Sequence, residues 1–346
     1  GYLLAYASQE LGSRVNGRIF QYRLGAHPGA MRAILRDIEA FAPHVVGFSC
    51  YCWNIEAVVT LARAMKRRWP GVRVVLGGPE AQPSRISLLE SGVVDALVLG
   101  EGEETFAELL RRCLDGQGWA GTPGTIAVEV GRGAPQRPAS ADLGSAYDAR
   151  GECLGVRRVV RGPQREFIEP LDRIPSPWLT RAFPRNTDVW NMAIVETSRG
   201  CPMDCSFCTW TNRRSKVRRF SDARVRSDLA ALATLREASV IVCDSDFFWD
   251  RARGLRLVHL MRRLSEKRGT QWYLEIGIER LDAEVIEATD HPCFGLGVGV
   301  ESLSESTLRL NGRRQNVMRA QAALNRLRLR PTRAEVNLQL ICGLPG

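Results

Sequence analysis

Apolar and polar residues follow two different periodicities along the first hundred residues of the chain. Residues 28–43 and 55–69 have the periodicity of amphipathic helices. Short apolar runs between and around them predict strands at residues 2–7, 18–24, 44–50, 72–76 and 95–100. Five strands with four crossover helices predict an α/β fold, a doubly wound and Rossmann-like domain at residues 1–115.

The composition changes at residues 116–189, which are rich in Gly, Pro, Arg and Ser. Prolines exclude a continuous helix at 170–179, and only residues 125–130 have a strand pattern. We therefore expect a linker with a short β excursion. Strands and helices alternate again beyond it, in five units that predict a partial (β/α) barrel at residues 190–346. Both ends of the sequence look cut, and we expect the barrel to be truncated at its C-terminus.

Charge and composition restrict the function only weakly. Hydrophobic residues make up 45% and charged residues 25% of the 346 positions, as in ordinary globular proteins. The net charge of +10 comes mostly from arginines scattered over predicted helices, without a nucleic-acid-binding motif, so we expect solvated helix faces and no nucleic-acid partner. The densest basic stretch, 212–220, leaves contact with an anionic substrate open.

Two further features concern the compartment. No apolar run reaches 18 residues, so a membrane span is not expected. The ten cysteines occur in a long chain with ample apolar core, which favours reduced thiols over a disulfide framework. We therefore expect a cytoplasmic protein.

Three of the cysteines are closely spaced. Cys201, Cys205 and Cys208 follow a predicted strand with the spacing C-x₃-C-x₂-C, and Phe207 lies just before the last of them. A structural zinc site needs four ligands, and no second cysteine pair follows at a useful spacing. Three thiolates would leave one iron of a [4Fe–4S] cluster open to a substrate or cofactor. Three incidental thiols in a turn are the plain alternative.

The stretch "RGCPMDCSFC" resembles the cluster motif of the radical S-adenosylmethionine superfamily. The resemblance implies that the three cysteines bind a [4Fe–4S] cluster, that S-adenosylmethionine binds the open iron, and that an external one-electron reductant such as flavodoxin or ferredoxin drives its cleavage to a 5′-deoxyadenosyl radical. It also implies cofactor contacts, for which the candidates are Phe207, Asp246, Glu275, Glu301 and Leu340. Each of the three acids has an alternative role as a strand-end salt-bridge partner.

The first domain resembles the cobalamin-binding domain that precedes the barrel in cobalamin-dependent radical S-adenosylmethionine enzymes. The resemblance is carried by residues 44–80, by "GEGEETFAELL" at 100–110 and by "LDRIPSPWL" at 171–179. It implies cobalamin contacts from the loops that follow the strands. The candidates are Ser49, Tyr51, Trp53, Asn54, Gly77, Gly78, Pro79, Glu80, Gly100, Glu101, Gly102 and Glu103.

One departure from the family pattern concerns the lower face of the cobalt. The loop at residues 6–17 has no histidine, and His27 and His44 lie elsewhere, which implies base-off cobalamin without a histidine ligand. Trp53 or its neighbours would pack there instead, although an ordinary core position explains Trp53 equally well. Gly77 and Gly78 suit either a nucleotide tail or a tight turn. For Cys50 and Cys52 we favour two small buried thiols over a metal site.

The resemblance implies a C-methyltransferase. One S-adenosylmethionine would recharge cobalamin with a methyl group, and a second would provide the radical that abstracts hydrogen from a carbon of a small secondary-metabolite intermediate, such as one on the way to an antibiotic. A cobalamin-dependent cyclase or ring-rearranging enzyme, and polar methylation of an aromatic ring, stay open. A methylthiotransferase is disfavoured because Cys50, Cys52 and Cys113 do not match its second cluster motif. A non-enzymatic iron–sulfur or zinc regulator is the remote alternative.

Overall fold

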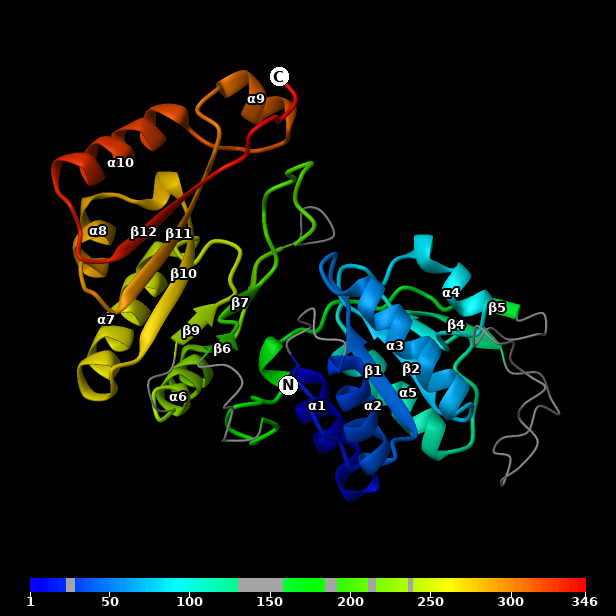
Figure 1. The fold of residues 1–346 in the computed structure, drawn as a ribbon. Coiled ribbons are helices and arrows are strands. Elements are labelled where there is room, and N and C mark those ends of the chain that lie inside the picture. The colour runs from blue at the N-terminus through cyan, green and yellow to red at the C-terminus, as the bar shows by residue number, and fades with distance from the viewer. Residues whose placement is uncertain (23–28, 130–157, 184–191, 211–215, 236–238) are drawn as a thin grey trace. The chain divides into compact units, whose positions relative to one another are not determined.

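The computed structural model describes residues 1–22, 29–129, 158–183, 192–210, 216–235 and 239–346. The chain divides into two compact units, Gly1–Ile168 and Glu169–Gly346, each with its own five-stranded sheet (Figure 1). The α/β class predicted from the sequence is therefore confirmed in both units. Within the described residues, no helix is long and apolar enough to cross a membrane.

The sheet of the first unit has the strand order β1-β2-β3-β4-β5. β1, β2 and β3 are parallel, and β4 and β5 extend the sheet as antiparallel strands. The five strands are β1 (Val45–Ser49), β2 (Arg73–Gly77), β3 (Ala96–Val98), β4 (Thr125–Glu129) and β5 (Arg158–Arg161). The strand expected inside the linker is thus part of the first sheet, and the boundary between the units follows Ile168, within the predicted linker.

Helices cover both faces of this sheet. They are α1 (Tyr2–Leu11), α2 (Ala30–Phe41), α3 (Ile55–Arg68), α4 (Ser87–Glu90) and α5 (Glu103–Leu114). Val74 and Leu76 of β2 pack in one apolar core with α2 and α3, whereas Val75 packs in a second core with Leu109 of α5. Successive residues of a strand point to opposite faces, so an apolar run such as β2 needs apolar cover on both sides.

The first two predicted strands are wrong. Residues 2–7 begin α1, residues 18–22 form no strand, and residues 23–28, including His27, lie outside the described residues. A short apolar run does not by itself distinguish a strand from a helix. Here Tyr6 and Ala7 pack against Ala107 of α5, and the run continues in helical conformation to Leu11.

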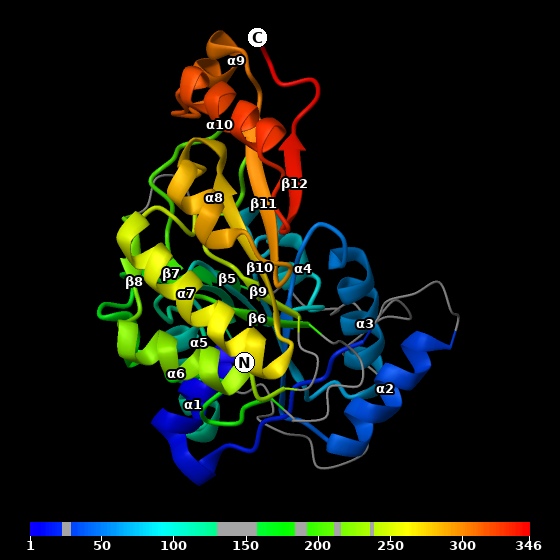
Figure 2. The ribbon, with the colours of Figure 1, turned by 90° about the vertical axis from the view of Figure 1, so that its left-hand side faces the viewer.

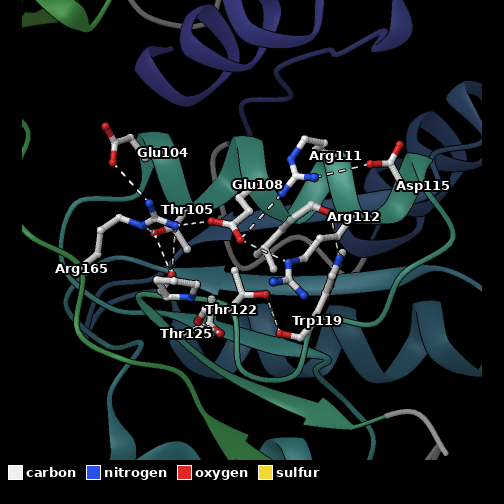
Figure 3. Close-up of polar contacts among 12 residues, drawn as sticks. Glu104, Thr105, Glu108, Arg111, Arg112, Asp115, Trp119, Thr122, Thr125 and Arg165 are labelled. Atoms are coloured by element: carbon white, nitrogen blue, oxygen red, sulfur yellow. Dashed lines mark hydrogen bonds and ion pairs between the residues drawn. The ribbon is translucent and has the colours of Figure 1, made fainter.

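Arg165 fastens the segment after β5 to α5 (Figure 3). Its guanidinium donates to Glu108 Oε2 at 2.5 Å, to Glu104 Oε2 at 3.3 Å and to Thr105 Oγ1 at 3.0 Å. Gly124 permits this close approach, because a Cβ atom there would lie 2.7 Å from Thr105 Oγ1. The segment after β5 is therefore held against α5, the helix that follows β3.

The second unit contains a parallel sheet with the strand order β12-β11-β10-β9-β6, as expected for a partial barrel. Its strands are β6 (Met192–Val195), β9 (Ser239–Val242), β10 (Gln271–Gly277), β11 (Phe294–Glu301) and β12 (Glu335–Leu340). A two-stranded ladder of β7 (Ser198–Arg199) and β8 (Arg218–Arg219) precedes the first helix. The helices are α6 (Asp222–Leu232), α7 (Arg251–Arg268), α8 (Ala283–Thr289), α9 (Glu305–Leu310) and α10 (Val317–Leu329).

The helices α6, α7 and α8 lie on one side of these strands (Figure 2). Trp272 of β10 joins the layers, since its buried indole donates to Ser265 Oγ at 2.7 Å and to Met261 O at 3.2 Å in α7. Val225, Leu229 and Leu232 of α6 are buried, as their helical spacing predicts. This packing leaves the carboxyl ends of the parallel strands to be covered by the loops that follow them.

The buried ion pair of the first unit gives a test of its core. Lys66 of α3 is 2% exposed and donates to Asp95 Oδ2 at 2.5 Å and to Val72 O at 2.7 Å. Asp95→Ala removes the paired carboxylate and should destabilise the protein by about 3–5 kcal/mol, because a buried ammonium without its counter-charge is costly.

The control is Glu39→Ala, which breaks the exposed ion pair with Arg68 and should cost below about 1 kcal/mol. Urea unfolding followed by circular dichroism measures both changes. Equal losses for the two variants would contradict the assignment of a buried, paired ammonium.

Candidate functional site

The three closely spaced cysteines lie on one loop, residues 201–208, which follows β7 in the second unit. Cys205 is buried, Cys201 is partly buried and Cys208 is exposed. The Cys208 amide donates to Cys205 O at 3.1 Å, which closes a turn between the last two. Burial raises the pKa of Cys205, the adjacent Arg313 opposes this rise, and the charges of Cys208 and Cys201 add to it. Cys205 is therefore close enough to Cys201 and Cys208 for their charges to affect its pKa.

The approach to this loop is fixed by Asp244, the residue that follows Cys243 after β9. Its fully buried carboxylate accepts the amides of Thr197 at 2.7 Å and Ser198 at 3.0 Å. Arg253 of α7 donates to Thr197 Oγ1 at 3.0 Å and to Phe220 O at 3.1 Å. Ser245 Oγ donates to Gly200 O at 2.7 Å, directly before Cys201. Contacts from the loop after β9 and from α7 thus hold β7, the strand after which the cysteine loop begins.

The loop has the donor set of a cluster bound through three thiolates, since it carries three sulfur atoms, and the guanidinium of Arg313 beside Cys205 partly offsets the effect of burial on that thiol. Within the described part of the chain, no group of three or more His, Cys, Asp and Glu side chains is arranged to hold a metal ion. The assignment of Cys201, Cys205 and Cys208 as cluster ligands therefore stays a prediction from their spacing.

A pocket at the carboxyl ends of the strands combines this loop with the three predicted acids. Cys201, Asp246, Glu275 and Glu301 all line it. Phe207 and Leu340 do not, and Leu340 is 62% exposed. The sequence analysis missed further lining residues, which are Pro202, Met203, Ser245, Trp249, Ile276, Gly277, Glu279, Gly299, Arg313, Arg314, Gln315 and Gln339. The run "GRRQ" at 312–315, directly after a short helix, was the available signal for Arg313, Arg314 and Gln315.

Asp246 is a strand-end ion-pair partner in this structure. Its Oδ2 accepts Arg280 Nε at 3.0 Å, and Arg280 also stacks on Trp249 at 4.8 Å from the ring centre. Burial raises the pKa of Asp246, and Arg280 opposes the rise. The alternative given for this acid, a salt bridge, is thus observed, and its predicted cofactor contact stays a prediction.

Glu275 and Glu301 face the pocket from neighbouring strands. Gln339 Nε2 of β12 lies 3.2 Å from Glu275 Oε2, and Arg313 lies 3.7 Å from Glu301 Oε1. Burial raises the pKa of both carboxyls, and the charge of Glu275 contributes to the rise at Glu301. Glu301 also has a φ of 59°, which an L-residue rarely adopts and which is typical of functional positions held by their surroundings.

Glycines of β11 make room for these side chains. A Cβ atom at Gly297 would lie 2.7 Å from Glu275 Oε2 and 2.9 Å from Gln339 Nε2. A Cβ atom at Gly299 would lie 3.0 Å from Glu301 Oε1 and 3.2 Å from Arg313. Side chains at these positions would push the polar groups of β10, β12 and the 313 region out of the pocket.

The predicted cobalamin loops of the first unit follow β1, β2 and β3. Because these strands are parallel neighbours, the loops share the edge at which open α/β sheets bind ligands. Trp53 is 76% exposed and stacks on Tyr51 with ring centres 4.5 Å apart. The alternative of an ordinary core position for Trp53 is therefore wrong. Cys50 is buried and Cys52 exposed, so only one of the two thiols is buried as expected.

Hydrogen bonds fix the shape of these loops. Asn54 accepts the Tyr51 amide at 2.7 Å and donates to Ser49 O at 2.9 Å, which closes the loop below Trp53. Gly78 has a φ of 91°, and a Cβ atom there would lie 2.7 Å from Cys50 O, so the tight turn alone requires glycine.

The acids of the loops after β2 and β3 also have partners within the first unit. Glu80 pairs with Arg85 at 2.5 Å. Glu101 accepts the Ile168 amide at 2.8 Å, and Glu103 is buried in the first turn of α5. These acids therefore help to shape the loops, and their predicted cobalamin contacts stay predictions.

Comparisons with known proteins find relatives of this chain. The family model of the B12 binding domain matches residues 19–110. The chain is 31% identical over 236 residues to the cobalamin-dependent radical SAM methyltransferase TokK of Streptomyces tokunonensis, which covers 66% of this chain and 30% of TokK. It is 33% identical over 215 residues to the 2-(S-pantetheinyl)-carbapenam-3-carboxylate methyltransferase of Streptantibioticus cattleyicolor, which covers 59% of this chain and 28% of that protein. The chain thus spans less than a third of the length of either relative.

A solved structure has a similar fold. The radical S-adenosylmethionine methyltransferase TsrM of Kitasatospora setae, solved with cobalamin and a [4Fe-4S] cluster bound, matches with a TM-score of 0.66 and 17% identity. The match covers 100% of this chain and 64% of TsrM.

The raised pKa of Glu275 predicts a pH-dependent effect on stability. The folded protein binds this proton more tightly than the unfolded chain does, so stability falls as the pH rises from the ordinary value of 4.5 through the raised pKa. Glu275→Gln keeps an oxygen acceptor for Gln339 but removes the charge. It should therefore unfold at a higher temperature than the wild type at about pH 8, with a difference that narrows toward about pH 5.

Thermal unfolding of the two proteins across this pH range measures the effect. The control is Glu287→Gln, an exposed acid of α8, which should show no such narrowing. A Glu275→Gln protein less stable than the wild type at about pH 8 would contradict the unfavourable burial of this charge.

Proposed function

Because the chain belongs to the cobalamin-dependent radical S-adenosylmethionine enzymes, we propose that it is part of a methyltransferase that moves a methyl group from methylcobalamin to a carbon of a secondary-metabolite intermediate. One observation carries the proposal: the loop that bears the three cysteines lines, through Cys201, Pro202 and Met203, the same pocket of a parallel sheet as the charged strand-end side chains. The same chain has a B12 binding domain ahead of it. Since the chain spans only part of its relatives, activity and substrate are both proposed.

In the second unit, Cys201, Cys205 and Cys208 would hold the [4Fe–4S] cluster. When bound, the cluster and S-adenosylmethionine would supply a 5′-deoxyadenosyl radical, after one electron arrives from a reductant such as flavodoxin or ferredoxin. Asp246, Glu275 and Glu301 present carboxylates to the pocket, and these would orient the positively charged amino and sulfonium groups of S-adenosylmethionine. The half-buried environment that raises their pKa values also strengthens such contacts.

In the first unit, the loops after β1, β2 and β3 would hold cobalamin, which would supply the methyl group. The Trp53 ring stacks on Tyr51, whose amide donates to the Asn54 side chain. Trp53 thus presents a large aromatic surface that nothing in the described first unit covers. Such a surface suits the flat corrin ring. We propose that it packs against the lower face of base-off cobalamin in place of a histidine.

The substrate class is inferred from the named relatives. Both TokK and the carbapenam-3-carboxylate enzyme are methyltransferases, and the second name identifies a 2-(S-pantetheinyl)-carbapenam-3-carboxylate substrate. We propose a small natural-product intermediate of the antibiotic type. A cyclase or ring-rearranging activity, and polar methylation of an aromatic ring, are the alternatives that the product assay below distinguishes.

Replacement of Cys201, Cys205 and Cys208 together by Ala should abolish the iron–sulfur absorbance near about 400 nm in anaerobically reconstituted protein. Cys243→Ala is the matched control, since burial raises the pKa of this thiol to about 12 and it lies outside the loop. The control should keep about four irons per chain. Iron retained by the triple variant would show that other residues bind the cluster.

The reaction itself is tested by counting products in the full-length protein with its substrate. Each methyl transferred should yield one S-adenosylhomocysteine and one 5′-deoxyadenosine, and deuterium at the target carbon should appear in the 5′-deoxyadenosine. Methylation without 5′-deoxyadenosine would indicate polar transfer, and 5′-deoxyadenosine without S-adenosylhomocysteine would indicate the cyclase. Either outcome would reject the proposed methyl transfer by a radical.

A further inference from the structure

The turn after α9, Asn311–Gly312–Arg313, contacts the cysteine loop with each of its three residues. Asn311 accepts the Ser206 amide at its carbonyl at 3.0 Å and the Ser206 hydroxyl at its Oδ1 at 2.9 Å. Gly312 has a φ of 68°, and a Cβ atom there would lie 2.3 Å from Asp204 O. Arg313 lies beside Cys205, where its positive charge lowers the pKa of the thiol against the larger effect of burial. Three successive residues of the turn thus contact three successive residues of the loop.

Asn311 is a rigid anchor for this contact. It is 3% exposed, and its amide group donates to Thr307 O at 2.9 Å and to Pro345 O at 3.0 Å. Its side chain therefore joins α9, the segment after β12 and the cysteine loop. A buried amide with all these partners resists rotation, because each lost partner leaves a buried polar group unsatisfied.

Arg313 connects the loop to the pocket. Its guanidinium lies 3.4 Å from Gly299 O and 3.7 Å from Glu301 Oε1, and its Nε is buried without a hydrogen-bond partner among the described residues. The cation is therefore shared between the thiol of Cys205 and the strand-end carboxylate, on the side of the loop that faces the pocket.

We propose that the 311–313 turn positions the cysteine loop: Asn311 and Gly312 fix the loop backbone before the cluster is assembled, and Arg313 provides the positive charge beside the assembled cluster. Within the loop, the Cys208 amide donates to Cys205 O, and the 311–313 turn adds contacts from a distant part of the chain. The role in the cluster rests on the proposed function, whereas the docking of the loop does not.

The docking is tested without metal. In the full-length apo protein, Asn311→Ala should speed alkylation of Cys205 by iodoacetamide about tenfold, because loss of the anchoring hydrogen bonds lets the loop open locally. Gly312→Ala should act in the same direction. The matched control is Asn316→Ala, which removes the N-cap of α10 but touches no residue of the cysteine loop. Equal labelling rates in Asn311→Ala and Asn316→Ala would overturn the proposal.

The role in the cluster is tested by iron content and reduction potential. After reconstitution, Asn311→Ala should bind less than half the iron of Asn316→Ala. Arg313→Met should lower the reduction potential of the cluster, because removal of a nearby cation disfavours an added electron, and Arg313→Lys should restore it. Unchanged potential in Arg313→Met would overturn the role of the charge. A wild-type protein that binds no iron would reject the proposed function, while the labelling experiment would still decide whether the turn docks the loop.

Discussion

The candidate site of the second unit depends on a steric constraint in β11, whose sequence "FGLGVGVE" has glycine at every second position. Side chains of a strand alternate between its faces, so Gly295, Gly297 and Gly299 leave one face of β11 without side chains. Tyr273 and Glu275 of β10 lie over this glycine face. A Cβ atom at Gly295 would lie 2.8 Å from the Tyr273 ring, and one at Gly297 would lie 2.6 Å from the Tyr273 hydroxyl. A parallel sheet normally fills such space with branched apolar residues, so a polar pocket is possible here because β11 has glycines on this face.

Neighbouring positive charges compensate only part of the negative charge of the three acids in this pocket. Asp246 and Glu301 each have an arginine nearby, whereas Glu275 has the neutral Gln339, and burial raises the pKa of all three acids. Partly desolvated carboxylates lower stability at neutral pH, a cost commonly seen where binding requires it. The unusual backbone of Glu301 adds to the same pattern. Buried acids with raised pKa values beside an unusual backbone conformation are typical of a binding site rather than of a structural strand end.

The two units present their candidate ligand groups by different physical means. In the first, the stacked pair of Tyr51 and the exposed Trp53 is supported by hydrogen bonds from the Asn54 side chain to the backbone of Ser49 and Tyr51. In the second, the cysteine loop is held mostly by residues distant in sequence, from Asp244 after β9 to Asn311 after α9. Local hydrogen bonding suffices for a rigid aromatic surface, whereas three thiols on a loop require contacts from several strand ends.

The sequence by itself determined the α/β class, most of the strands, the three-cysteine loop and the acids at the strand ends. These features depend on periodicity and on short-range spacing, which a chain displays whether or not it is folded. The tertiary structure decided that residues 2–7 are helical, because only the packing of Tyr6 and Ala7 on α5 distinguishes a helix from a strand there. It also decided that β4 and β5 complete the first sheet and that Arg313 and Gln339 join the pocket. Each of these results depends on contacts between segments far apart along the chain, which no local pattern specifies.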